Sequence, residues 1–291
     1  MKTSIAKLAV GLTLVSMSSI AMAGIATTKH NLGSGGQFNH VRGAGTTTEI
    51  CVFCHTPHGA DSSAAVPLWN RTLGTSGMYQ TYADLGTTTL DAESAPVGSV
   101  SLACLSCHDG TQAMNVVINS PGSGTTGDVN IQKVGGVTSY ISTAAGVDCT
   151  ASDGSCGGFN EFNIMSQVAS EMIYLSTDLR NDHPISIQYA GPVDGSAAKD
   201  PDFRAASSAT VAGGKVVWYV EAKDGSGGAL TAAGKQKQDL PLYKRTGTGA
   251  LNGQSLVECA TCHDPHTNTT TFLRNPNGNA GSSTCLTCHD K

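Results

Sequence analysis

The stretch Cys259-Ala260-Thr261-Cys262-His263-Asp264-Pro265-His266 decides how this 291-residue chain can fold. Two cysteines separated by two residues place both sulfurs on one side of a tight turn. The histidine that follows directly can then bind the iron of the group that the sulfurs hold. This order of residues is typical of c-type haem attachment, with two thioether bonds and a proximal imidazole.

The Cys-x-x-Cys-His pattern occurs four times in the chain. A single copy would also fit a zinc ribbon or a redox dithiol. A histidine after every one of four pairs argues against zinc, iron–sulfur and thioredoxin-like chemistry, and predicts four covalently bound haem c groups with iron. The residues are Cys51, Cys54, His55, Cys104, Cys107, His108, Cys259, Cys262, His263, Cys285, Cys288 and His289.

Two of the remaining histidines repeat one local arrangement. His58 and His266 each follow a proximal histidine by three residues, with a proline between them. A residue so near the proximal ligand cannot reach the opposite face of the same porphyrin, and the proline disfavours a continuing helix. Each is therefore predicted to be the distal ligand of a different haem.

The other distal ligands are harder to assign. His183 lies between a possible helix, 162–175, and a possible strand, 185–189, and is predicted as a third distal ligand. His30 and His40 compete for the fourth position. Methionine ligation by Met114 is the alternative, but its apolar neighbours favour packing.

The N-terminus predicts export. Lys2 and Lys7 precede an apolar run over 8–20, and Ala21-Met22-Ala23 completes a secretory signal, residues 1–23. No later stretch has the roughly 20 consecutive apolar residues that a spanning helix needs. The expected destination is the outer surface or the extracellular space, with the periplasm as the alternative.

Composition limits both the core and the partners. The chain has 35 glycines and only 5% aromatic residues, too little apolar bulk for an ordinary core, so the haems are expected to fill the interior. Its net charge of −5 becomes −7 without Lys2 and Lys7, which makes nucleic acid and anionic membranes poor partners.

The motifs divide the chain into regions. Residues 24–111 form an N-terminal two-haem module with an N-terminal arm, and 256–291 form a shorter copy. Between them, 112–255 is rich in glycine, serine and threonine, with strand-like runs at 129–134 and 215–221 and a predicted local disulfide between Cys149 and Cys156. The expected fold is organised by haem and mostly irregular, with short helices near the haems, a β-rich middle region and little regular secondary structure.

Residues 51–60, 66–71, 104–111, 181–186 and 259–266 together resemble the multihaem cytochromes with doubled haem motifs of metal-reducing bacteria. In particular they resemble the tetrahaem outer-surface cytochromes that polymerise into extracellular filaments. The resemblance implies bis-histidine haems in a continuous chain, and head-to-tail self-assembly with one axial histidine donated by the neighbouring subunit. Through this resemblance, and its place on a glycine-rich arm, His30 is the predicted donor.

The predicted function is electron transfer, not catalysis of a substrate reaction. The expected partners are further copies of the chain, other multihaem cytochromes, or extracellular acceptors such as metal oxides. Two other functions stay open, a discrete periplasmic electron shuttle and a reductase with one five-coordinate haem.

Overall fold

The computed structural model describes residues 24–33, 48–112, 114, 116–119, 132–133, 174–224, 234–246 and 248–290. The signal segment, His40, the predicted Cys149–Cys156 disulfide and nearly all of the possible helix over 162–175 lie outside these residues. Of the strand expected at 129–134, only 132–133 fall within them.

Helices in the described part of the chain are short, and every α-helix carries a haem motif. They are α2 (Ser99–His108), α3 (Cys259–Cys262) and α4 (Ser283–Cys288). Single 3-10 turns occur at Gly24–Thr27, Cys51–Phe53, Ser76–Met78, Tyr82–Leu85, Gly249–Leu251, Thr270–Phe272 and Ala280–Ser282. The expectation of little regular secondary structure, with short helices near the motifs, is confirmed.

The strands form one antiparallel sheet of five and one parallel pair. The sheet has the order β3-β7-β6-β5-β4, and β1 pairs with β2. The strands are β1 (Val116–Val117), β2 (Gln132–Lys133), β3 (Ile187–Gln188), β4 (Ser207–Thr210), β5 (Val216–Val220), β6 (Leu240–Lys244) and β7 (Ser255–Val257). The middle region is therefore β-containing, as expected, and β5 matches the run of β-branched and aromatic residues that predicted it.

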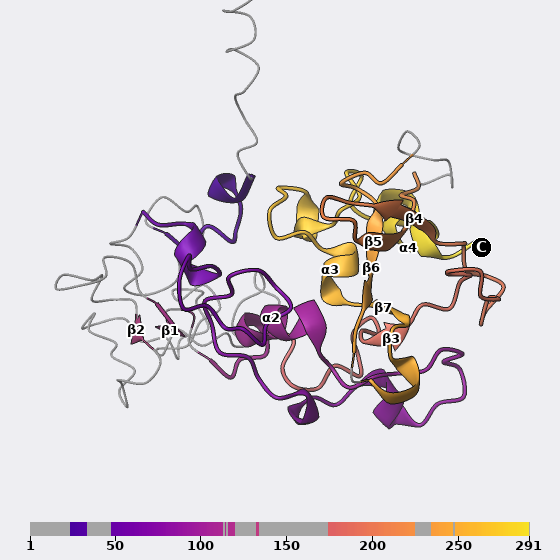
Figure 1. The fold of residues 1–291 in the computed structure, drawn as a ribbon, viewed down its shortest axis with the longest axis horizontal. Coiled ribbons are helices and arrows are strands. Elements are labelled where there is room, and N and C mark those ends of the chain that lie inside the picture. The colour runs from indigo at the N-terminus through magenta and orange to yellow at the C-terminus, as the bar shows by residue number, and fades with distance from the viewer. Residues whose placement is uncertain are drawn as a thin grey trace, which may run out of the picture.

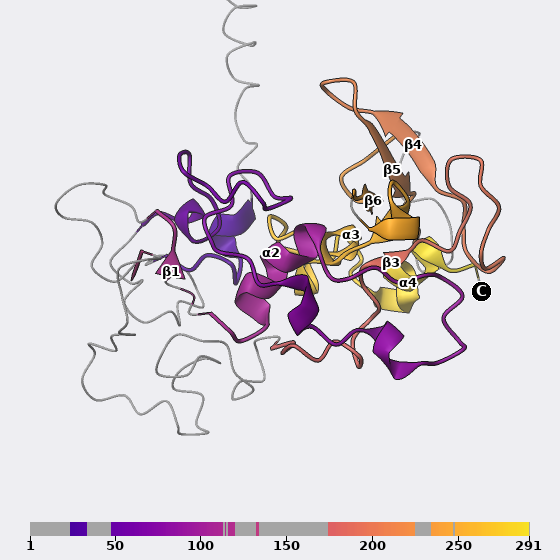
Figure 2. The ribbon, with the colours of Figure 1, turned by 60° about the horizontal axis from the view of Figure 1, so that its bottom comes forward.

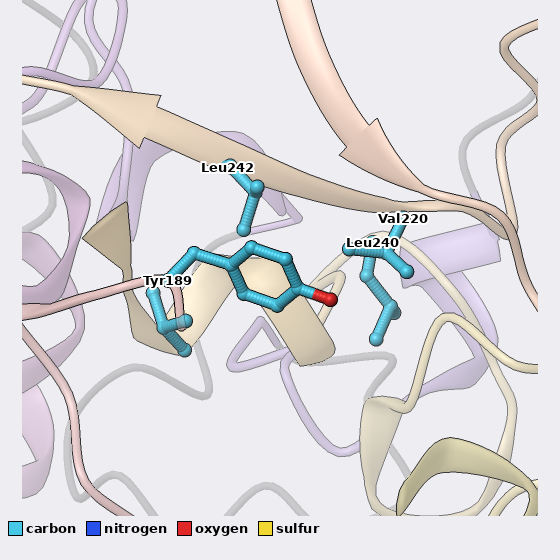
Figure 3. Packing of buried hydrophobic residues seen from close by; sticks show 5 residues of the cluster. Tyr189, Val220, Leu240 and Leu242 are labelled. Carbon is cyan, nitrogen blue, oxygen red and sulfur yellow. The ribbon is translucent and has the colours of Figure 1, made fainter. Parts of the chain in front are cut away.

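The sheet holds the largest apolar cluster. Trp218 pairs with Leu242 and Val220 with Leu240 across β5 and β6. Figure 3 shows the side chains of Leu242, Leu240 and Val220 around the ring of Tyr189. Cys262 and Cys288 pack against this cluster, so the sheet supports the third and fourth motifs.

The first two motifs rest on a smaller cluster. Phe53, Met114 and Val117 are buried together, and Cys54 and Cys107 pack against them. In Figures 1 and 2, α2 lies between the β1–β2 pair on one side and α3, α4 and the sheet on the other. No helix in the described residues is long and apolar enough to cross a membrane.

Candidate functional site

Each motif forms a compact turn, here numbered 1 to 4 in chain order. Turns 1, 3 and 4 close with a hydrogen bond from the histidine N–H to the carbonyl of the first cysteine. The donor–acceptor distances are 2.7 Å for His55, 3.0 Å for His263 and 2.9 Å for His289. Turn 2 lies inside α2, which ends at His108. All eight motif cysteines are free thiols, as covalent attachment requires.

Two proximal imidazoles are oriented by backbone carbonyls. Nδ1 of His55 lies 2.8 Å from the carbonyl oxygen of Pro67, and Nδ1 of His263 lies 2.8 Å from that of Thr271. A carbonyl oxygen only accepts hydrogen bonds, so Nδ1 carries the proton in both rings. Nε2 therefore keeps its lone pair for a metal, the tautomer that ligating histidines adopt.

The fold brings histidines from distant segments together in pairs. The ring centroids of His55 and His266 are 6.2 Å apart, and those of His30 and His108 are 6.1 Å apart. Two imidazoles on opposite sides of one metal have centroids about 6 Å apart, because each metal–nitrogen bond is about 2 Å and the centroid lies about 1 Å beyond the nitrogen. Both pairs therefore fit axial ligation of one haem iron.

The side chain of His30 contacts residues of its own chain. Its ring stacks on Phe272 with a centroid distance of 4.1 Å, and its Nδ1 atom is buried without a hydrogen-bond partner. Burial, followed by the proximity of His108, lowers the pKa of His30 to about 4, so the ring is neutral at pH 7 and able to ligate. The sequence predicts that His30 ligates a haem of a neighbouring subunit. In the structure its ring lies 6.1 Å from that of His108 in the same chain.

His183 lies near turn 3. The pKa of His263 is lowered mainly by burial, and Arg274 and His183 contribute further repulsion. His58 is exposed, as His183 and His266 are, but among the described residues no ring contact places it beside another histidine. Among the described residues, no three His, Cys, Asp or Glu side chains lie close enough together to hold a metal ion.

Thiols of successive turns lie next to one another. Burial, and then the neighbouring Cys107 of turn 2, raise the pKa of Cys54 in turn 1 to about 12. The Cys104 thiol of turn 2 shares a hydrogen bond with the Cys259 thiol of turn 3, and this contact raises the pKa of Cys104. Burial, and then Cys262 of turn 3, raise the pKa of Cys288 in turn 4. The four turns therefore follow one another in space in the order 1-2-3-4.

A buried carboxylate joins turns 2 and 3. Glu258 precedes Cys259, and its side chain is fully buried. Its Oε2 atom accepts hydrogen bonds from Ser101 Oγ of α2 at 2.6 Å and from Ser186 Oγ at 3.0 Å. Arg245 Nε lies 3.5 Å from Oε1, and burial raises the pKa of Glu258 despite this cation. No motif in the sequence marks Glu258 as part of the site.

One comparison with known proteins gives a match, and it covers the third and fourth motifs. Residues 252–291 match the family model of the doubled CXXCH motif. That match supports a multihaem c-type cytochrome. No curated protein matches the chain.

The site residues fit haem c. Each turn presents two thiols and a histidine, and two turns already have a second imidazole at the distance for axial ligation. A bound haem c would supply a one-electron iron couple whose potential depends on its axial ligands and their hydrogen bonds. The residues of this chain would attach the group, saturate the iron and exclude water.

Proposed function

We propose that the protein conducts electrons along four closely packed bis-histidine haems. The order of the four turns carries this proposal, because cysteine side chains of each turn lie near those of the next. Groups attached at these sulfurs would lie in near contact, and electron transfer slows steeply as the separation between redox centres grows. Two strong imidazole ligands per iron leave no position for a substrate, so we propose electron transfer and no enzymatic reaction.

Three ligand pairs within the chain follow from the histidine positions. We assign His266 to the haem of His55, His30 to that of His108, and His183 to that of His263. The first two pairs rest on centroid distances of 6.2 and 6.1 Å, and the third on the proximity of His183 and His263. His266 then bridges turns 1 and 3, as cross-ligation between haems requires.

His58 is assigned a different role, because among the described residues no contact places it beside a proximal histidine of its own chain. Its carbonyl accepts hydrogen bonds from Thr56 Oγ1 at 3.0 Å and from the Asn119 side chain, so its backbone is held in place while its ring is exposed. Turn 1 and turn 4 lie at opposite ends of the row of turns. We therefore propose that His58 donates to the turn 4 haem of a neighbouring subunit and joins subunits head to tail. Such a contact repeats into a filament unless its rotation closes a ring.

The filament would be exported and would pass electrons to other multihaem cytochromes or to extracellular acceptors such as metal oxides. The acidic balance of the chain supports this choice, since its net charge of −5 favours cationic rather than nucleic-acid surfaces.

Two histidine variants test the assignment. His58→Ala should leave soluble monomers with four attached haems, one of them high spin when isolated. His266→Ala should also create one high-spin haem but leave the subunit contact intact. Intact mass gives the haem count, electron paramagnetic resonance gives the spin state, and electron microscopy gives the assembly. Filaments formed by His58→Ala would overturn the subunit contact, and a haem count other than four would overturn the cytochrome assignment.

A further inference from the structure

Three segments that contain no haem motif contact turns 1, 3 and 4 in the same way. We name them brace 1 (68–70), brace 3 (272–274) and brace 4 (202–204) after the turns they contact. The middle residue of each brace forms an antiparallel bridge with the motif histidine. These bridges are Trp69 with His55, Leu273 with His263, and Phe203 with His289.

Two backbone hydrogen bonds flank each bridge. The N–H of the third brace residue donates to the carbonyl of the second motif cysteine, and the residue after the histidine donates to the carbonyl of the first brace residue. The first set is Asn70 to Cys54 at 2.9 Å, Arg274 to Cys262 at 2.8 Å and Arg204 to Cys288 at 2.9 Å. The second set is Thr56 to Leu68 at 2.9 Å, Asp264 to Phe272 at 2.8 Å and Asp290 to Asp202 at 2.7 Å.

The third brace residue also reaches the turn through its side chain. In each case a side-chain N–H donates to the carbonyl of the residue directly after the first cysteine. The bonds run from Asn70 Nδ2 to Val52 at 2.7 Å, from Arg274 Nε to Ala260 at 2.9 Å and from Arg204 Nε to Leu286 at 2.9 Å. One asparagine and two arginines therefore perform the same task.

The turns need such support because they are too short to be stable alone. The helical segment spans three residues in turn 1 and four in turn 3. Helices of this length are unstable in water, and the last carbonyls of a helix have no partner within it. The side chains of Asn70 and Arg274 satisfy one of these carbonyls in each turn, and the backbone of the brace satisfies the carbonyl two residues later.

Braces 1 and 3 also begin with a strained backbone. Leu68 and Phe272 have φ values of 56° and 58°, in the left-handed region that is unfavourable for residues other than glycine. The preceding carbonyls, of Pro67 and Thr271, are the ones that accept from Nδ1 of His55 and His263. The same corner therefore fixes the turn and the plane of the proximal imidazole.

We propose that Asn70, Arg204 and Arg274 are positioning residues that hold turns 1, 4 and 3 in the conformation that carries haem. They act through the turn backbone and set the orientation of the proximal histidine. Turn 2 is supported differently, because α2 has ten residues and the Arg71 guanidinium donates to the Ser106 carbonyl at 2.9 Å. The proposal rests on haem attachment at the turns, as proposed above.

The arginine braces allow the sharper test, because Asn70 is fully buried and also bonds Asn119, whereas Arg204 and Arg274 are partly exposed. Arg204→Met and Arg274→Met should each retain four haems by intact mass. Each should shift the low-spin resonance of one haem only. Hydrogen exchange should rise about tenfold in the matching turn and stay unchanged in the other, since a hydrogen bond from a charged donor is lost.

Two controls separate positioning from charge. Arg204→Lys keeps a cation near Asp290, which Arg204 contacts at 2.8 Å, but lacks the Nε donor, so it should behave as Arg204→Met does. Arg180→Met removes an exposed arginine that pairs with Asp178, and should change neither measurement. Wild-type resonances and exchange rates in both Met variants would overturn the brace proposal. Fewer than four haems in the wild-type protein would instead overturn the tetrahaem assignment.

Discussion

The two halves of the molecule carry their motifs on different supports. Turns 3 and 4 pack on the five-residue cluster beneath the antiparallel sheet, whereas turns 1 and 2 pack on Phe53, Met114 and Val117. Yet turns 1 and 3 share the same bridge, the same pair of backbone hydrogen bonds and the same side-chain contact. Turn geometry therefore depends on the local brace, and the sheet adds stability to one half only.

Loss of a haem should have the largest effect, and the effect should differ between the two halves. Cys51→Ala with Cys54→Ala should unfold residues 48–72, because few apolar side chains remain to support that half. Cys285→Ala with Cys288→Ala should leave β5 and β6 folded, because their strand pairing and cluster persist. Hydrogen exchange of the two regions measures the effect. Equal protection in both double variants would contradict the difference between the halves.

Removing the cation at the junction of the halves should have the next largest effect. Above the raised pKa of Glu258, where its carboxylate is charged, Arg245→Met leaves this buried charge without its nearby guanidinium and should cost about 3–5 kcal/mol of unfolding free energy. Urea denaturation measures it, with the exposed pair of Arg180 and Asp178 as a control whose loss should not move the midpoint. A small effect of Arg245→Met would show that other groups neutralise Glu258.

The pH dependence of the unfolding free energy tests the contribution of Glu258, the buried carboxyl between turns 2 and 3. Burial raises the pKa of Glu258, so the fold favours the protonated carboxyl. The stabilisation that the protonated Glu258 carboxyl gives the fold is fully present below the ordinary carboxyl pKa. It is lost as the pH rises through the raised pKa of Glu258 in the folded protein. The slope cannot exceed about 1.4 kcal/mol per pH unit for one proton. Glu258→Gln should remove this slope, and an unchanged pH profile of the unfolding free energy would refute the assignment.

The smallest effect concerns Trp69, the middle residue of brace 1. Trp69 lies against His55 with centroids 5.9 Å apart, and its buried indole N–H has no hydrogen-bond partner. Leu273 takes the same place in brace 3 and has no polar group. Trp69→Phe should therefore change the unfolding free energy by less than about 1 kcal/mol. A larger loss in urea denaturation would show that brace 1 depends on the indole.

Much of the architecture could be predicted from local sequence. The four Cys-x-x-Cys-His turns are segments of five residues, so their conformation depends on close neighbours. The strand at Val216–Val220 was predicted because β-branched and aromatic residues favour pleated backbone. Its partner β6 has the sequence Leu-Pro-Leu-Tyr-Lys and was not predicted individually, because proline is unusual within a sheet. The low content of regular structure was predicted from a composition poor in aromatic residues.

The sequence by itself determined which residues can attach and ligate haem, because that chemistry needs fixed residue types at fixed short spacing. Only the tertiary structure decided which partners meet. His30 lies beside His108, and Arg204 binds the carbonyl of Leu286, a residue 82 positions away. Glu258 joins Ser101 from another half of the chain at a separation of 157 positions. Contacts over such distances depend on how the whole chain packs, and no local pattern in the sequence encodes them.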